Sequence, residues 1–365
     1  MQIFLVGGAL RDSLLRKAGR DIAPADRDWV VVGATPEEMI RLGFKPVGKD
    51  FPVFLHPETH EEYALARTER KTTHGYHGFT FYTAPSVTIE EDLARRDLTI
   101  NAIAQDAKGT IIDPFGGVRD LETKTLRHVS EAFVEDPLRV LRLARFAARL
   151  PDFSVARETM ALLKEMVSSG ETDHLVAERV LSEISRGLMQ RDPVRMLDVL
   201  LACGFWQRTF PQLEITQALK AALTRAAKEK APLINRISLL LSSACAENIK
   251  ELCLGMKLPA DATDAATLFV RFRKTACEAK TAEDFYALFS AFDVLRRPER
   301  LETFLLTMHL AGVALNKDLL GKLSSAYKEV PLDGILKDSN ASKNTKSLAE
   351  KIHEARLNAL KKVLL

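Results

Sequence analysis

The chain has 365 residues, which is long enough for two or three domains with their own cores. Hydrophobic residues make up 46% and charged residues 28%, an ordinary balance for a soluble protein. The net charge is only +3, which excludes a global positive field, so any surface that binds RNA must be local.

The N-terminal residues predict a first strand and not a targeting segment, because the short apolar run 1–8 has no basic stretch before it. No stretch approaches the roughly 20 apolar residues of a membrane span. Four cysteines lie in the second half, and none pairs closely with another as metal ligands do. We expect reduced, mostly buried thiols in a cytoplasmic protein.

The next elements alternate between strand and loop signals, which predicts a mixed α/β region over roughly the first 115 residues. Short helices are expected at 11–18 and 36–42. Strands are expected at 3–6, 29–32, 53–56, 62–65, 100–104 and 110–112. From about residue 130 the apolar residues recur at helical spacing, so a helical array is expected to the end, with 337–344 as its clearest loop.

Three features of the α/β region suggest phosphate and metal chemistry. Gly7 and Gly8 follow a strand, and glycines at such a turn let backbone amides approach a phosphate, although a purely structural turn is the commoner explanation. Asp26 and Asp28 lead into an apolar strand and point to one face, an arrangement that suits Mg²⁺. Glu62 begins a later strand and is the candidate third carboxylate.

Arginines mark three further places. Residues 67–82 are basic, aromatic and glycine-containing, which favours a mobile loop near an anionic substrate or a plain surface loop. Arg95 and Arg96 precede a buried-looking stretch, either as phosphate ligands or as a helix-end charge pair. A stripe of arginines spaced three residues apart follows Asp136, and arginine at each position favours recognition over a solvated face: Arg139, Arg142 and Arg145.

The order of these motifs resembles the class II tRNA CCA-adding enzymes, members of the DNA polymerase β-like nucleotidyltransferase superfamily. Residues 51–57 resemble the bacterial branch, and 177–183 resemble the helix-turn motif of its neck. The matching motifs are Gly7-Gly8-x-x-Arg11-Asp12, Asp26-x-Asp28, Arg95-Arg96-Asp97-Leu98-Thr99-Ile100-Asn101-Ala102 and Glu135-Asp136-x-x-Arg139.

The resemblance implies a role for each matching residue. Asp26 and Asp28 would hold the catalytic Mg²⁺ ions, with Glu62 as a further catalytic carboxylate. Asp136 and Arg139 would read the base, and 67–82 would be the flexible loop tied to the switch from C to A addition. The remaining nucleotide contacts would be Gly8, Arg11, Arg96, Arg142 and Arg145.

Two departures from the family pattern are visible. The segment between Leu15 and Asp26 is about five residues longer than in close relatives, so the turn before Asp26 differs. Many bacterial relatives carry an HD phosphohydrolase domain after the neck, but this sequence contains no His-Asp dipeptide.

The fold class expected is α+β, with a polymerase β-like head at 1–127, a helical neck at 128–200 and a helical body and tail for tRNA binding at 201–365. The function expected is template-independent addition of CCA to tRNA from CTP and ATP, with no membrane and no obligate protein partner. A poly(A) polymerase, or an enzyme adding only CC or only A, shares these motifs.

Two other classes of protein remain as alternatives. A non-catalytic RNA-binding protein on the same scaffold is disfavoured because Asp26 and Asp28 are both retained. A dinucleotide-binding oxidoreductase is disfavoured because G-x-G-x-x-G is absent.

Overall fold

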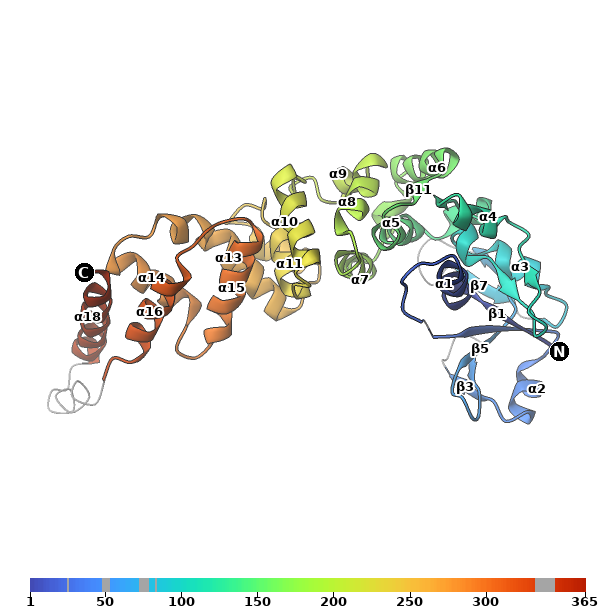
Figure 1. Ribbon diagram of the computed structural model, residues 1–365, viewed down its shortest axis with the longest axis horizontal. Coiled ribbons are helices and arrows are strands. Elements are labelled where there is room, and N and C mark those ends of the chain that lie inside the picture. The colour runs from blue at the N-terminus through green and yellow to red at the C-terminus, as the bar shows by residue number, and fades with distance from the viewer. Residues whose placement is uncertain (25, 48–52, 72–78, 83, 332–344) are drawn as a thin grey trace. The chain divides into compact units, whose positions relative to one another are not determined.

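The computed structural model describes the chain except for residues 25, 48–52, 72–78, 83 and 332–344. The chain divides into two compact units, Met1–Thr209 and Phe210–Leu365. The predicted head and neck therefore fold together as one unit, with the strands in its first part and helices after them (Figure 1). Among the described residues, no helix is both long and apolar enough to cross a membrane.

The sheet of the N-terminal unit is mixed. In the described residues its strand order is β3-β4-β5-β2-β1-β8-β9, and the β2–β5 pair is parallel. The strands are β1 (Gln2–Val6), β2 (Asp28–Val32), β3 (Lys45–Val47), β4 (Val53–Leu55), β5 (Glu62–Leu65), β8 (Ala104–Gln105) and β9 (Ile111–Ile112). Two small pairs complete the set: β6 (Thr68–Lys71) with β7 (Phe79–Tyr82), and β10 (Thr125–Leu126) with β11 (Ser154–Val155).

Both faces of the sheet are buried, which explains the uninterrupted apolar run of β2. Val30 belongs to one core cluster with Phe4 and Val6, whereas Val31 belongs to another with Met39. Successive strand residues point to opposite faces, so an apolar residue is needed at each position.

In the first part of this unit helices pack with the sheet, and the part that follows is mainly helical. Those of the first part are α1 (Gly7–Lys17), α2 (Pro36–Arg41), α3 (Ile89–Ala94), η1 (Thr99–Asn101, a 3-10 turn), α4 (Gly117–Glu122) and η2 (Glu131–Glu135). Those that follow in the same unit are α5 (Arg139–Arg149), α6 (Arg157–Ser168), η3 (Glu171–His174), α7 (Ala177–Leu188), α8 (Pro193–Ala202) and α9 (Phe205–Thr209). Helix α5 packs against α7 and α8 and so forms the centre of this helical part.

The C-terminal unit is helical throughout its described residues. Its helices are α10 (Gln217–Lys228), α11 (Leu233–Leu240), α12 (Ile249–Gly255), α13 (Ala260–Glu278), α14 (Ala282–Phe292), α15 (Pro298–Leu310), α16 (Lys317–Lys328) and α18 (Thr345–Leu364). The last helix packs on α14 and α16, where Leu360 is fully buried and Arg356 lies 4.8 Å from the centre of the Tyr327 ring. The terminal helix is therefore docked on the other helices of this unit through Leu360.

Three expectations from the sequence need correction. Residues 100–104 are not one strand, because tight hydrogen bonds from Asn101 N–H to Leu98 O and from Ala102 N–H to Thr99 O close the turn η1. Residues 67–82 are not one loop, because β6 and β7 pair within them, while 72–78 lie outside the described residues. The helix expected at 11–18 begins four residues earlier, at Gly7.

The cysteines also differ from the expectation. All four are free thiols, but two of them, Cys245 and Cys277, are exposed, whereas Cys203 and Cys253 are buried. Spacing in the sequence does not show which face of a helix each thiol occupies, so their burial depended on the packing.

Helix α4 is held against η1 by close backbone contact at Gly117. Asp113 caps the helix, accepting hydrogen bonds from the N–H groups of Gly117 at 2.7 Å and Val118 at 2.9 Å. A Cβ atom at Gly117 would collide with the carbonyl oxygen of Thr99.

We predict that Gly117→Ala lowers the free energy of unfolding by roughly 1–3 kcal/mol, because the backbone of η1 must move to admit the methyl group. Urea unfolding measures this change. Glu122→Ala, at an exposed position of the same helix, is the control and should stay within about 0.5 kcal/mol of the parent protein. Equal stability of the two variants would contradict the close approach.

Candidate functional site

Strand pairing brings the predicted carboxylates to one edge of the sheet. Asp28 pairs with Val6 of β1 on one side and with Glu62 of β5 on the other. Neighbouring residues in register project to the same face, so Asp28 and Glu62 lie beside each other, next to the turn that begins α1. The sequence placed the carboxylates at the starts of two separate strands, and the register of β2 with β5 brings them together.

Gly7, the first glycine of the pair, leaves space beside these carboxylates. Gly7 has a φ of +67°, a left-handed conformation that favours glycine. A Cβ atom there would lie 3.2 Å from Nη1 of Arg96 and 3.5 Å from Oδ2 of Asp28. Gly7 thus allows a carboxylate and a guanidinium to approach the backbone together.

Negative charge accumulates at Asp28. Burial raises the pKa of Asp28 most, the charges of Glu62 and Asp26 raise it further, and only Arg96 acts against them. Glu62 and Asp26 therefore lie close enough to Asp28 to repel its charged carboxylate. Hard oxygen donors that repel one another in this way fit a divalent cation such as Mg²⁺. In the described part of the chain, no group of three or more His, Cys, Asp or Glu side chains has a metal-binding geometry.

A buried carboxylate holds the arginine pair. Asp92, which is fully buried in α3, accepts hydrogen bonds from Arg95 at 2.7 Å and from Arg96 at 3.1 Å. Burial alone would raise the pKa of Asp92, but Arg96 and Arg95 lower it below its usual value. Arg95 and Arg96 therefore lie at a helix end, as one of the two interpretations of the sequence expected. Asp92 fixes both guanidinium groups beside the carboxylates.

Arg11 is buried and engaged in a similar network. Its Nε donates to Asp12 at 2.9 Å and its Nη1 donates to Asn101 at 2.5 Å. Its guanidinium lies 5.0 Å from the centre of the Phe146 ring on α5. The conformation of Arg11 is therefore fixed before any ligand binds.

Asp97 joins this network to α5. It accepts bonds from Asn101 at 2.9 Å and from Arg142 at 2.6 Å. Burial alone would raise the pKa of Asp97, but the charge of Arg142 and hydrogen bonds from Asn101, Arg142 and the N–H of Leu98 lower it to about 2. Asp97 is thus a fixed negative charge over the neutral range.

The arginine stripe of α5 is not a solvated face. Arg139 is 7% exposed and donates to the carbonyl oxygens of Ala132 at 2.8 Å and Arg95 at 2.6 Å. Arg145 binds Glu183 of α7 at 2.6 Å. Each arginine of the stripe therefore bonds to another element of the same unit.

A cavity of about 520 Å³ lies over this network. Seven arginines and three aspartates line it, which gives it a strongly positive wall suited to a polyanionic ligand. Its lining residues are Gly7, Gly8, Arg11, Asp28, Arg67, Arg95, Arg96, Asp97, Asn101, Asp136, Leu138, Arg139, Arg142, Phe146 and Arg179.

The cavity brings together most of the predicted site. Asp26 and Glu62 do not line it, although their charges act on Asp28. Arg145 does not line it either and is bound to Glu183 instead, and its contact with a nucleotide stays a prediction.

Some residues of the site were not singled out from the sequence. Asp92 lies three and four residues before the two arginines that follow the end of α3, a spacing that could have identified it as their partner. Phe146 has no such signal, because in the sequence it is one of several apolar residues of α5, and its contact with Arg11 comes from the tertiary packing.

Comparison with known proteins gives the family. Residues 3–127 match the poly A polymerase head domain, and 152–216 match a family described as the probable RNA and SrmB-binding site of polymerase A. The chain is 44% identical to a multifunctional CCA protein from Dechloromonas aromatica, covering 100% of this chain and 98% of that one. It is 47% identical to a CCA-adding enzyme from Pseudomonas putida, covering 99% and 98%.

Solved structures share the fold. A CCA-adding enzyme in its apo form II superposes with a TM-score of 0.72 at 24% identity, covering 100% of this chain and 88% of that one. The α+β architecture, with a nucleotidyltransferase head and a helical remainder, is confirmed by this similarity.

We predict that Asp97→Asn lowers the free energy of unfolding by roughly 2 kcal/mol at pH 7. Because the folded-state pKa is depressed to about 2, this contribution is complete above pH 4 or so and is lost as the pH falls toward 2. Urea unfolding at pH 7 and pH 3 of the variant and its parent measures it. The exposed Glu90→Gln should differ little from the parent at either pH, and a pH-independent loss in Asp97→Asn would rule out the charge as its cause.

Proposed function

This chain belongs to the bacterial CCA-adding enzymes, which are tRNA nucleotidyltransferases, and we propose that it adds the complete CCA triplet to tRNA in the cytoplasm. The reaction would be attack of the tRNA 3′-hydroxyl on the α-phosphate of CTP, twice, and then of ATP, with release of pyrophosphate. No nucleic-acid template is required if the protein itself reads the base.

The observation that carries this proposal is the joining of a carboxylate edge to an arginine-lined cavity. Asp28 lies in both, so a triphosphate bound by the arginines would have its α-phosphate beside the carboxylates. Such an arrangement stabilises the charge of phosphoryl transfer mainly by position and electrostatics. Relatives of the same fold are described as complexes with CTP and with ATP, which agrees with a nucleotide in this region.

Asp26 and Asp28 are proposed to hold Mg²⁺, with Glu62 as the neighbouring carboxylate. Bound there, the metal would supply Lewis-acid chemistry that lowers the pKa of the attacking hydroxyl and stabilises the leaving oxygen. Their oxygen donors and mutual repulsion at Asp28 support this assignment. Gly8, Arg11 and Arg96 would bind the triphosphate, since all three line the cavity and both arginines are preorganised.

Asp136 and Arg139 are proposed to select the base. Cytosine and adenine both present an amino donor beside a ring-nitrogen acceptor, whereas uracil and guanine present the reverse order. A carboxylate that accepts and a guanidinium that donates match the first pattern. Both residues line the cavity, and the side chain of Asp136 is oriented by a 3.1 Å hydrogen bond from the N–H of Leu138, the residue just before α5.

We predict that Asp26→Asn and Asp28→Asn each reduce kcat by at least about a thousandfold without lowering the melting temperature, because neither side chain is in the core. Incorporation of labelled CMP into tRNA lacking CCA measures the rate. Glu58→Gln, an exposed carboxylate on the loop before β5, is the matched control and should keep full activity. Near-normal turnover by either aspartate variant would remove the carboxylate edge from the mechanism.

We predict that Asp136→Ala loses selectivity against UTP and GTP by roughly tenfold to hundredfold, because a lost or mismatched buried polar contact costs about 1–3 kcal/mol. The measurement is kcat/KM for the four nucleotides. Glu135→Ala removes the same charge from the preceding residue, outside the cavity, and should keep the parent ratios. Arg139→Ala is a weaker test, since it also removes two hydrogen bonds to backbone carbonyls.

The number and kind of nucleotides added distinguish complete CCA addition from the related activities. With both nucleotides, tRNA lacking CCA should lengthen by three nucleotides and stop. Arrest after CC, addition of A alone, or a long adenylate tail would instead assign a partial CCA-adding enzyme or a poly(A) polymerase.

A further inference from the structure

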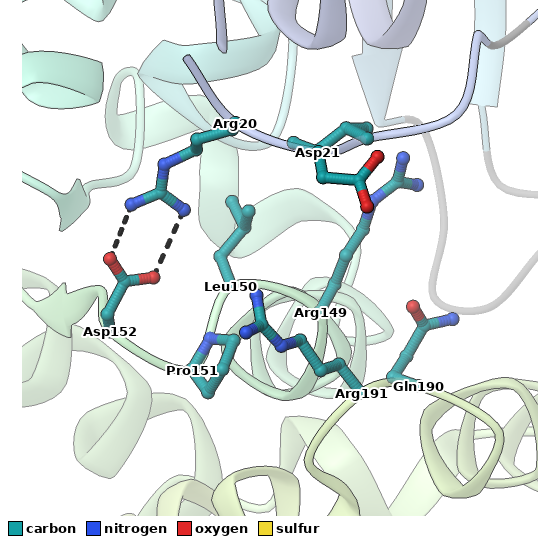
Figure 2. A pocket seen from close by; sticks show the side chains of 9 residues that line it. Arg20, Asp21, Arg149, Leu150, Pro151, Asp152, Gln190 and Arg191 are labelled. Carbon is teal, nitrogen blue, oxygen red and sulfur yellow. Dashed lines mark hydrogen bonds and ion pairs between the residues drawn. The ribbon is translucent and has the colours of Figure 1, made fainter. Parts of the chain in front are cut away.

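A second cavity, of about 750 Å³, lies within the N-terminal unit and has no role in the function proposed above (Figure 2). Three segments form its wall: the chain after α1, the end of α5, and the turn between α7 and α8. The lining residues are Arg20, Asp21, Ile22, Arg149, Leu150, Pro151, Asp152, Gln190 and Arg191.

One ion pair fixes the shape of this cavity. Figure 2 shows both Nη atoms of Arg20 bonded to the carboxylate of Asp152. Lys124 also binds Asp152, at 3.0 Å, and Arg20 lies 5.1 Å from the centre of the Phe153 ring. These contacts hold the chain after α1 against the end of α5.

Two other arginines leave donors for a ligand. Arg191 is exposed and makes no hydrogen bond or ion pair with any residue that the structure describes. Arg149 uses Nη2 to bind Asp12 at 2.6 Å, and its side chain is 31% exposed. Buried Leu150 and half-buried Pro151 provide an apolar surface between these cations.

In the sequence, one wall of this cavity lies only a few residues before the carboxylate of Asp26. Ile22 on its wall is four positions before Asp26, a backbone span of at most about 14 Å. The carboxylate of Asp12 also links the two cavities, because it binds Arg149 of the second and Arg11 of the first. Asp152, Gln190 and Arg191 lie within the region that matches a probable RNA-binding family.

We propose that this cavity binds a phosphodiester of the tRNA 3′ strand upstream of the attacking hydroxyl, with Arg191 and Arg149 as donors and the Pro151 surface against the ribose. The inference rests on the proposed function for the identity of the RNA. Three arginines face two aspartates here, against seven and three in the first cavity. This smaller excess of positive charge suits one phosphodiester with its sugar better than a free triphosphate.

The test is the binding of labelled tRNA ending in CC to the full-length protein, without nucleotides, followed by fluorescence anisotropy. Arg191→Ala should raise the Kd about tenfold and flatten the slope of log Kd against log salt by about one. Arg191→Glu should weaken binding further. Asp21→Asn should lower the Kd, because it removes an exposed negative charge from the cavity wall.

Arg186→Ala is the matched control, since Arg186 is an exposed arginine on the neighbouring helix α7 but lies outside the cavity. It should bind tRNA as the parent does. An unchanged Kd in Arg191→Ala, an equal loss in Arg186→Ala, or no tRNA binding by the parent would overturn the proposal.

Steady-state kinetics of A addition to the same tRNA show whether the bound phosphate belongs to the tRNA or to a free nucleotide. The KM for tRNA should rise in Arg191→Ala, whereas a rise in the KM for ATP instead would assign the cavity to a free triphosphate and overturn the proposal. If the parent protein binds tRNA but adds no nucleotide, the proposed function fails while the binding comparison still decides the role of this cavity.

Discussion

The N-terminal unit depends on two buried aspartates that bind one face of α5. Asp12 and Asp97 are 0% and 6% exposed, and they bind Arg149 and Arg142 at 2.6 Å each. The two arginines are seven residues apart, about two helical turns, so they project from the same face. Because a buried carboxylate without a partner is strongly unfavourable, these pairs fix α5 against α1 and the turn η1.

Both cavities depend on this junction. Arg142 lines the first and Arg149 lines the second, while Asp12 also orders Arg11. Arginines held by carboxylates lose less side-chain freedom when a phosphate binds than free surface arginines would. The carboxylates thus serve recognition by preorganising cations, at the cost of desolvating their own charges.

Around Asp28, in contrast to these ion pairs, charges of the same sign lie close together. Burial raises the pKa of Asp28 most, and the charges of Glu62 and Asp26 repel its carboxylate and raise the pKa further. This repulsion opposes folding but favours a divalent cation, which agrees with the general tendency of active sites to hold groups in unfavourable surroundings. The paired register of β1, β2 and β5 maintains that arrangement.

The sequence by itself determined the α+β class, the strands that carry the carboxylates and the change to helices, because alternating and helical periodicities are local properties. Motif order also identified the family. Only the tertiary structure decided that Asp28 stands beside Glu62, that Arg139 and Arg145 bond to other elements, and that residues 20–22 meet 190–191 at a second cavity. These contacts join residues far apart in the chain, and no local pattern specifies which distant partner neutralises a buried charge.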